Sequence, residues 1–302
     1  MSEKYELIDA EKATLTETGD KKYTIAAMCE WLEVSTSGYY EWVDRPDSAT
    51  TRRRQFLALL VIKAFEESDE TYGHRRVHAQ LLRWGQHRTP ELVRSMMREL
   101  DLVPCQPRPW RHNLTESDPC AGPIPDLVHR DFTAEAPGRK MVGDITYIPT
   151  WEGWLYLATV IDCHTKSIVG WAMGDNYKTP LITTAITMAA RNYTLEPGAI
   201  FHSDRGSNYT SREFADALAA LDVRQSVGRT GICYDNAMAE SFFGALKNEL
   251  VNRTVYPTRE HARRDIARYI EVRYNTQRLH SGLGYKTPRE VHDEFLNRQH
   301  TA

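Results

Sequence analysis

The segment Met141-Val-Gly-Asp-Ile-Thr-Tyr-Ile148 is rich in apolar and β-prone residues and ends before Pro149. This pattern predicts a central strand that is buried on both faces. Two more strands, Trp154 to Ile161 and Lys166 to Met173, follow after short links, so the three form an antiparallel meander. Asp144 lies inside the first strand, where a carboxylate is costly unless it is paired or binds a cation.

The segments after the meander alternate between helix and strand. The patterns predict a helix from about Pro180 to Arg191, a strand over Ala199 to His202, a helix from Ser211 to Leu221 and a last strand over Val223 to Val227. Three antiparallel strands followed by alternating helix and strand are the order of a ribonuclease H-like fold. We therefore predict an α/β core with a mixed five-stranded sheet and helices, preceded by all-α helix-turn-helix domains.

Two further carboxylates lie at positions that are typical of catalytic or ligand-binding residues. Asp204 follows the strand Ala199 to His202 and precedes the turn Arg205 to Asn208, a place where catalytic groups gather in sheets with α/β units. Glu240 lies on a predicted helix and shares one face with Gly244 and Lys247. The alternative is a solvated Glu–Lys helix face, which leaves the buried Asp144 unexplained.

The opposite face of that helix is apolar and is expected to pack on the sheet. It carries Met238, Phe242, Ala245 and Leu246. The glycine on the polar face leaves space for a bulky ligand close to Glu240. Among other polar residues, we interpret Asp162 as a turn residue and Asp235 as a helix N-cap. His202 has two interpretations, either contact with metal-bound water or DNA, or a structural role.

A helix-turn-helix pattern lies upstream of the core. One helix carries Val77 and Leu81, and Thr89-Pro90-Glu91 is a strong start signal for the next. Arg94 and Arg98 lie off the apolar stripe of this second helix, where they are placed to reach phosphates or base edges in a major groove. Helix packing without DNA contact is the alternative. An earlier helical pair precedes Arg52-Arg53-Arg54, a run that we interpret as a solvated helix start rather than as a DNA contact.

These patterns divide the chain into six segments. They are an acidic tail or linker (1–22), an N-terminal helical region (23–66), a helix-turn-helix DNA-binding domain (67–112), a linker (113–130), the core (131–255) and a C-terminal helical extension (256–302). The linker prediction rests on the five prolines from Pro107 to Pro125.

Charge is distributed unevenly along the chain. The net charge is −3, but residues 71–112 hold 8 basic and 3 acidic side chains and residues 256–302 hold 9 and 6. DNA contact is therefore expected in those two regions. No apolar stretch reaches the roughly 18 residues of a membrane span, and the acidic N-terminus is no signal peptide, so we expect a cytoplasmic protein.

The cysteines and histidines do not form a metal-binding pattern. The five cysteines are odd in number and widely spaced, which argues against a disulfide framework. His74 and His78 have metal-ligand spacing, but Cys105 and Cys120 downstream are fourteen residues apart with prolines between them, so we reject a zinc site.

Three blocks of the core together resemble the integrase catalytic core of bacterial insertion-sequence transposases. They are Asp144-Ile-Thr-Tyr147, His202-Ser-Asp-Arg-Gly-Ser207 and Asn236-Ala-Met-Ala-Glu-Ser-Phe-Phe243. Thirty-five residues separate Asp204 from Glu240, an interval typical of this family and of retroviral integrases.

The resemblance is to the orfB product of the insertion sequence three family and runs from about Tyr23 to Phe295. Lys247 falls where the family carries Lys or Arg. Further matches are Tyr72-Gly-His-Arg-Arg-Val-His78 and the tail Tyr274-Asn-Thr-Gln-Arg-Leu-His-Ser-Gly-Leu-Gly-Tyr285. Two departures are small, since Leu279 replaces a frequent Pro and Val142-Gly143 replaces a frequent Trp and polar residue.

The resemblance implies a DDE-type transposase, a polynucleotidyl transferase that cleaves DNA at insertion-sequence ends and transfers the strand. Asp144, Asp204 and Glu240 would be both catalytic residues and metal ligands for two Mg²⁺ (or Mn²⁺) ions. Asp144 would bridge the ions and the other two would each complete one. Carboxylate oxygens suit Mg²⁺, and paired ions suit phosphodiester chemistry.

The expected partners follow from the same resemblance. They are DNA, as terminal inverted repeats and as target, further copies of the chain in a homo-oligomer on DNA, and an upstream orfA product fused to or associated with it. The acidic stretch Met1 to Asp20 is consistent with such a junction. We expect no membrane partner. The resemblance also implies a bacterial cytoplasmic protein that associates with the nucleoid when it acts on DNA. The predicted DNA-binding residues are Lys247, Arg94, Arg98, Arg75 and Arg76.

Two other functions fit parts of the sequence. A non-catalytic DNA-binding regulator would share the helix-turn-helix patterns, but the intact carboxylate triad favours the enzyme. A structure-selective nuclease of the same fold would have less need of two helix-turn-helix patterns.

Overall fold

The computed structural model describes residues 2–14, 22–105, 124–228 and 236–301. Most of the predicted linker around Pro107, and Asp235, lie outside these residues. The chain divides into two compact units, Met1–Leu60 and Val61–Ala302. Helix α4 (Ala49–Glu66) begins in the first unit and ends in the second.

The first unit is helical. Its first three helices are α1 (Ser2–Glu11), α2 (Ile25–Trp31) and α3 (Thr36–Val43). The side chains of Thr24 and Ser35 accept hydrogen bonds from backbone N–H groups in the first turns of α2 and α3, which fixes where these helices begin.

Helix α1 corrects the predicted N-terminal tail. Tyr5 and Ile8 are three residues apart, so both lie on one helix face. They are buried in a cluster with Met28, Cys29 and Tyr39. The sequence pattern missed this helix because α1 carries few apolar residues and its packing partners come from later in the chain.

The second unit begins with the predicted helix-turn-helix. Its helices are α5 (His74–Arg83) and α6 (Pro90–Glu99), which pack on each other. Thr89 caps α6 by accepting a hydrogen bond from the N–H of Leu92 at 3.3 Å, and Pro90 occupies the first helical position. Both features were predicted from the sequence.

A five-stranded mixed sheet forms the centre of the second unit. Its strands are β1 (Lys140–Thr150), β2 (Gly153–Asp162), β3 (Ile168–Gly174), β4 (Ile200–Ser203) and β5 (Arg224–Val227). The order across the sheet is β3-β2-β1-β4-β5. The first three strands pair antiparallel, whereas β1–β4 and β4–β5 pair parallel. The predicted meander and mixed sheet are confirmed.

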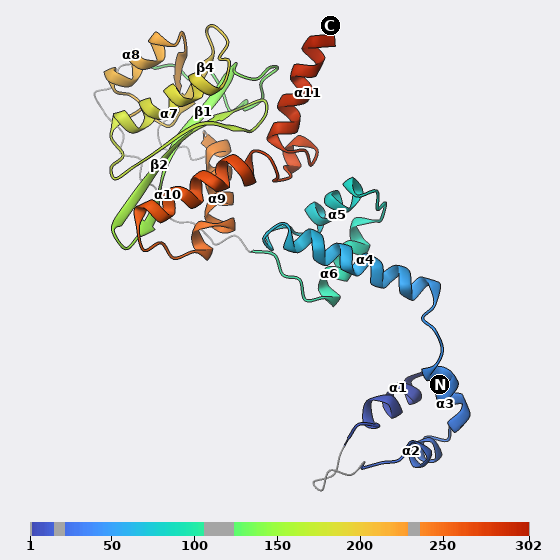
Figure 1. Ribbon diagram of the computed structural model, residues 1–302. Coiled ribbons are helices and arrows are strands. Elements are labelled where there is room, and N and C mark those ends of the chain that lie inside the picture. Colours follow the sequence, from blue (N-terminus) through green and yellow to red (C-terminus); the bar gives the residue numbers. More distant parts are fainter. Residues whose placement is uncertain (1, 15–21, 106–123, 229–235, 302) are drawn as a thin grey trace. The chain divides into compact units, whose positions relative to one another are not determined.

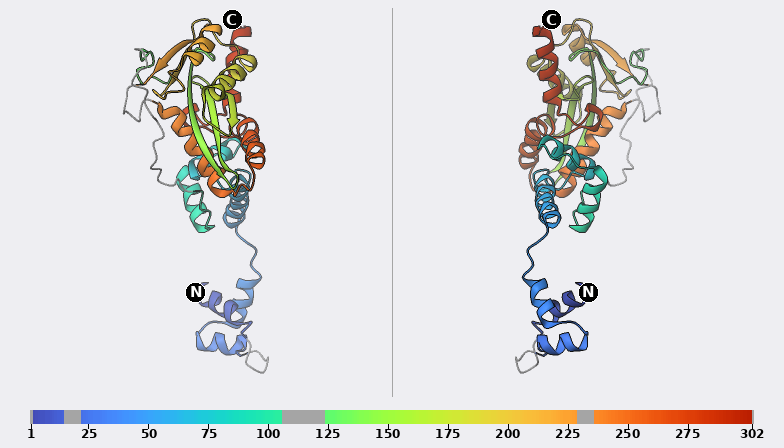
Figure 2. Two further views of the ribbon diagram at one scale, coloured as in Figure 1. Left: turned by 90° about the vertical axis from the view of Figure 1, so that its left-hand side faces the viewer. Right: turned by 90° about the vertical axis from the view of Figure 1, so that its right-hand side faces the viewer.

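Helices cover both faces of the sheet (Figure 1), and Figure 2 shows the layers from two other directions. Helices α7 (Thr179–Asn192) and α8 (Arg212–Ala220) pack on one face around Phe201 and Phe214. Helices α9 (Ala237–Glu249) and α10 (Arg259–Arg268) pack on the other around Phe242 and Ile266. The central strand β1 is thus covered on both faces, as its apolar sequence predicts.

The C-terminal extension is helical, with one irregular stretch. A short 3₁₀ turn η2 (Val251–Arg253) follows α9, and α10 continues into a π-helical segment η3 (Tyr269–Tyr274). A 3₁₀ turn η4 (Ser281–Leu283) and helix α11 (Pro288–Thr301) complete the chain. Single π-helical turns of this kind occur often near functional sites.

The end of the predicted linker is packed rather than extended. The N–H of Val227 donates to the carbonyl of Pro125 at 3.2 Å, and the N–H of Leu127 donates to Ser226 Oγ at 2.9 Å. Val128 is buried. Residues 125–128 therefore belong with the core beside β5, because apolar side chains among the prolines find a surface to pack on.

Candidate active site

Asp144 lies in the middle of the longest strand. It pairs with Thr159 on β2, and its Oδ1 accepts a hydrogen bond from the N–H of Ile145 at 2.7 Å. Strand β4 pairs with β1 only over residues 140–142, so Asp144 lies just beyond the point where β4 ends. The carboxylate is half-buried and fixed by the sheet.

The residue before Asp144 has to be a glycine. A Cβ built at Gly143 would lie 2.2 Å from the ring of Phe201 on β4, which is closer than any side chain tolerates. The carbonyl of Gly143 accepts a hydrogen bond from Asn236 Nδ2 at 3.2 Å. Asn236 directly precedes α9, so this contact connects the start of the helix to β1 beside Asp144.

Asp204 comes immediately after β4, at its C-terminal end. Its Oδ1 accepts a hydrogen bond from the N–H of Gly206 at 3.1 Å, which closes a tight turn. Tyr209 is buried nearby, and its pKa is raised by burial and then by the charges of Asp144 and Asp204. One tyrosine thus lies within electrostatic reach of both aspartates, which places them in the same neighbourhood.

Glu240 lies in the first turn of α9 and is exposed. The predicted apolar face of this helix is confirmed, since Phe242 and Leu246 are buried and Met238 and Ala245 pack against the same cluster. A Cβ at Gly244 would meet nothing within 4 Å, so the space expected beside Glu240 is present.

Lys247 is buried, which counts against the alternative of a solvated Glu–Lys helix face. It is only 9% exposed, and its Nζ lies 4.9 Å from the centroid of the Tyr147 ring on β1. Burial lowers the pKa of Lys247 to about 8, while the charge of Asp144 opposes this shift. The shared helix face predicted that Lys247 lies on the same side of the helix as Glu240, but nothing in the sequence indicated its aromatic partner Tyr147.

Negative charge is concentrated at Asp144. Burial raises the pKa of this carboxyl well above its ordinary value, and the charges of Asp204 and Glu240 raise it further. The N–H of Ile145 and the charge of Lys247 oppose these effects without outweighing them. The other two carboxylates predicted from the sequence, Asp204 and Glu240, therefore lie within electrostatic reach of Asp144.

The donor set fits a hard divalent cation. Two buried oxygens beside Asp144, Thr159 Oγ1 and Asn236 Oδ1, have no hydrogen-bond partner within the described part of the chain. A bound cation would reduce the repulsion between the carboxylate charges and would give the unpaired oxygens a partner. Across the same residues, no three side chains of His, Cys, Asp or Glu already stand close enough to hold a metal ion. Glu240 is the exposed member of the set.

Two other polar residues have structural roles. Asp162 is fully buried and accepts hydrogen bonds from the N–H of Gly138 and from the N–H and hydroxyl of Thr165. The turn assigned to it from the sequence is confirmed. His202 is buried, and its Nδ1 lies 2.8 Å from Ser226 Oγ on β5, which favours the structural interpretation.

The helix-turn-helix gathers some of the predicted DNA-binding residues. Arg75 and Arg94 line one pocket of about 390 Å³. The remaining lining residues are His74, His78, Pro90, Glu91 and Tyr285. Arg98 is exposed one turn further along α6. Arg76 is half-buried, and its Nε donates to the carbonyl of Leu279 at 3.0 Å, a contact that competes with any contact to DNA.

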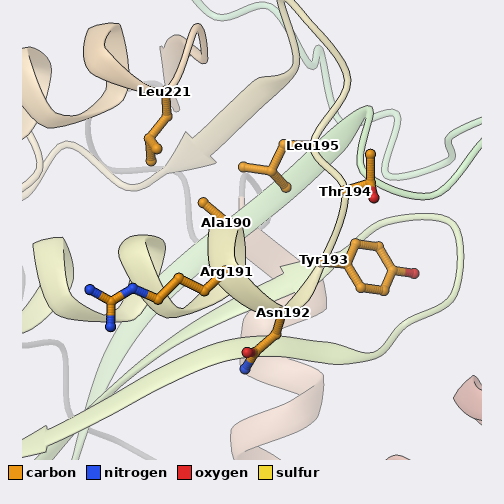
Figure 3. Close-up of a pocket in the computed structure, with 7 residues that line it drawn as sticks. All are labelled: Ala190, Arg191, Asn192, Tyr193, Thr194, Leu195 and Leu221. Carbon is orange, nitrogen blue, oxygen red and sulfur yellow. The ribbon is translucent and has the colours of Figure 1, made fainter.

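A larger pocket lies at the C-terminal end of α7 (Figure 3). Its volume is about 470 Å³, and its lining residues are Ala190, Arg191, Asn192, Tyr193, Thr194, Leu195 and Leu221. None of the three carboxylates lines this pocket, so it is separate from the candidate active site.

Comparisons with known proteins agree with this architecture. The family described as Integrase core domain matches residues 134–233, a second Integrase core domain family matches residues 221–288, and an HTH-like domain matches residues 51–110. The match confirms the predicted ribonuclease H-like fold class of the core. A chain of the simian T-cell lymphotropic virus intasome has a TM-score of 0.46 and 15% identity over 71% of this chain and 73% of that one.

Whole-length relatives identify the family. The insertion element IS600 31 kDa protein of Shigella sonnei is 37% identical over 268 residues, which are 89% of this chain and 98% of that protein. Transposase InsF for insertion sequence IS3A of Escherichia coli (strain K12) is 34% identical over 293 residues, 94% and 99% of the two chains. The chain therefore belongs to the IS3 family of insertion-sequence transposases, with an integrase-type catalytic core. Among the described residues, no helix is long and apolar enough to cross a membrane.

Proposed function

We propose that Asp144, Asp204 and Glu240 form the catalytic triad of this transposase and hold two divalent ions, Mg²⁺ or Mn²⁺. The observation that supports the proposal is the raised pKa of Asp144, to which burial, Asp204 and Glu240 all contribute. A structural site would avoid such a concentration of like charge, whereas a cation site depends on it.

Each residue of the triad has a distinct support. Asp144 is held by the strand, Asp204 by the turn that Gly206 closes, and Glu240 by the first turn of α9. When bound, two divalent ions activate the attacking oxygen and stabilise the leaving oxygen. Attack on phosphorus by water gives a nick and releases a 3′-hydroxyl. Attack by that hydroxyl on a target phosphodiester joins the element end to the target phosphate, breaks the target's P–O3′ bond and releases a target 3′-hydroxyl. Neither Ser203 nor Tyr147 is therefore needed as a nucleophile.

The same proposal assigns the DNA contacts. Arg75 and Arg94 line one pocket on the helix-turn-helix and Arg98 follows on the exposed side of α6, so these three are placed to bind a terminal inverted repeat. Lys247 lies near Asp144 and would contact a phosphate close to the cleaved bond.

Assembly is the remaining part of the proposal. Joining two element ends to one target needs more than one active site near the same DNA, so we propose a homo-oligomer on DNA. An upstream orfA product, fused or associated, would add to end recognition. Adding that product should then strengthen binding of the ends; unchanged binding would remove it from the proposal.

A strand-transfer assay tests the central claim. The substrate is a duplex carrying the element's own end, incubated with target plasmid and Mg²⁺ or Mn²⁺. We expect cleavage and transfer by the parent chain and none by Asp144→Asn, Asp204→Asn or Glu240→Gln. Full transfer by any one of these variants would mean that another carboxylate acts. End binding without any cleavage by the parent would favour the regulator.

A further inference from the structure

A buried ion pair joins the end of the catalytic helix to the C-terminal extension. The guanidinium of Arg278 donates from Nε to both carboxylate oxygens of Glu249 at 2.9 Å and from Nη2 to Oε1 at 2.6 Å. The two side chains are 8% and 6% exposed. Tyr269 adds a hydrogen bond from its hydroxyl to Glu249 Oε2 at 2.8 Å. Glu249 is the last residue of α9, roughly 14 Å along the helix axis from Glu240.

The residues on either side of Arg278 are held by the helix-turn-helix region. The N–H of Leu279 donates to the hydroxyl of Tyr72 at 2.7 Å, and that hydroxyl donates to the carbonyl of Gln277 at 3.3 Å. Arg76 on α5 donates from Nε to the carbonyl of Leu279 at 3.0 Å. Tyr72 and Leu279 are both buried, so these contacts are shielded from water.

A second route connects the same segment to α9. Arg278 Cζ lies 5.7 Å from the centroid of the Tyr274 ring. That ring meets the ring of Phe242 edge-on, with centroids 4.7 Å apart. Phe242 is two residues from Glu240 on α9. Arg278 thus contacts the helix directly at its end and, through Tyr274, near its catalytic glutamate.

We propose that Glu249 and Arg278 are positioning residues, which hold the helix-turn-helix at a fixed distance and angle from the catalytic helix. The inference rests on the proposed function of both parts. DNA bound by Arg75 and Arg94 on the helix-turn-helix then presents one particular phosphodiester to Glu240 on α9. The pair itself touches neither DNA nor metal.

The chemistry of the pair favours positioning over simple stabilisation. A buried ion pair adds little net stability compared with apolar side chains of the same size, but its geometry is specific. A bidentate Arg–carboxylate contact restricts both distance and orientation, which an apolar contact does not. The pair lies where the helix-turn-helix, the C-terminal extension and α9 meet. Fixing the distance and orientation of these elements there would fix how bound DNA is aligned with Glu240.

The test measures which bond is cut. The full chain is incubated with Mn²⁺ and saturating amounts of an end-labelled duplex that carries the element's terminal repeat. For Arg278→Met we expect the cleavage rate to fall by about 100-fold, or the cuts to spread over neighbouring phosphodiesters. Affinity for the duplex should change by less than about threefold, because the residues that bind it remain.

Two further variants separate positioning from folding. Glu249→Leu/Arg278→Met removes both charges, leaves no unpaired buried ion and should fold, as circular dichroism and thermal unfolding will show. We expect it to keep the cleavage defect. Arg212→Met removes an arginine from the exposed ion pair with Asp216 on α8 and should cut as the parent does.

The outcomes are distinct. If the double variant recovers both the parent rate and the single cut position, the pair serves stability alone and the inference is wrong. The same holds if Arg278→Met cuts the parent's bond at the parent's rate. If the parent chain itself does not cleave, the proposed function fails rather than this inference.

Discussion

The ammonium of Lys247 lies over the ring of Tyr147, 4.9 Å from its centroid, so helix α9 places a cation against strand β1. Tyr147 is three residues from Asp144, and the charge of Asp144 acts on Lys247. The only lysine among the predicted DNA-binding residues is thus held between an aromatic ring and the charge of Asp144, rather than on an outer surface.

Lys247→Met should weaken binding of the element's ends and lower the salt dependence of that binding. One phosphate contact corresponds to a slope change of about 0.9 in a plot of log affinity against log salt. Lys247→Arg, which keeps the charge, is the control and should retain the slope. Equal slopes for the Met variant and the parent would mean that Lys247 contacts no phosphate.

Asp144→Asn should abolish cleavage without lowering stability in the absence of metal. The pKa of Asp144 is raised, so its charged form is less stable in the folded chain than in the unfolded chain. This cost is absent below the unfolded pKa and appears as pH rises through the folded pKa. At neutral pH the neutral variant should therefore unfold at the same temperature as the parent or higher. Added Mg²⁺ should stabilise the parent more than the variant; equal gains would count against metal binding.

Asp162→Asn should destabilise the fold by about 1–3 kcal/mol and leave the folded enzyme active. The carboxylate is buried and accepts three hydrogen bonds, and an amide would turn an NH₂ group towards one of the donors. Urea unfolding measures the loss. Asp216→Asn, on the exposed face of α8, should stay within about 0.5 kcal/mol of the parent. Complete inactivity of folded Asp162→Asn would assign it a catalytic role.

Arg94→Ala/Arg98→Ala should lower the preference for the element's ends over random DNA. If each arginine reads a base edge, the discrimination lost is about 1–3 kcal/mol per residue. Arg139→Ala/Arg212→Ala removes the same charge from exposed ion pairs with Glu135 and Asp216, outside the two basic regions, and serves as the control. A uniform loss of affinity on all DNA, with the preference retained, would mean that Arg94 and Arg98 contact phosphates only.

Glu249→Gln should make the chain less sensitive to acid. Burial opposes the charged form of Glu249, but the hydrogen bonds and charge of Arg278 outweigh it and lower the pKa. The stability that the charged group contributes is present above the ordinary pKa of Glu and is lost as pH falls through the lowered folded pKa. Between about pH 5 and pH 2 the parent should therefore lose more unfolding free energy than the variant. Parallel losses would mean that Glu249 does not titrate with the fold.

Local signals were sufficient for much of the fold and for the carboxylates. The β-prone residues around Asp144 predict the strand that contains it, and Thr89-Pro90 predicts the start of α6 within one residue. Asp204 and Glu240 were predicted from turn and helix positions together with the family resemblance, and the structure brings both within electrostatic reach of Asp144. These signals depend on residues that are close together in the sequence, so they can be read from the sequence of one chain.

Contacts between distant residues left no such signal. The burial of Lys247 depends on Tyr147, one hundred residues earlier, and the partner of Arg278 is set by how α9 meets the C-terminal extension. Helix α1 depends on Met28 and Tyr39, whose own helices had to be placed first. Charge and periodicity describe which face of an element is polar, but not which other element covers it.

The shortness of β4 has a consequence for the substrate of the proposed site. Because β4 pairs with β1 only over residues 140–142, the edge of β1 beside Asp144 has no neighbouring strand within the described chain. Duplex DNA is a stiff rod that does not fold into a deep cavity. If DNA binds at the three carboxylates as proposed, a long polymer would lie across this side of β1 without threading through the protein, and neither of its ends would have to be free.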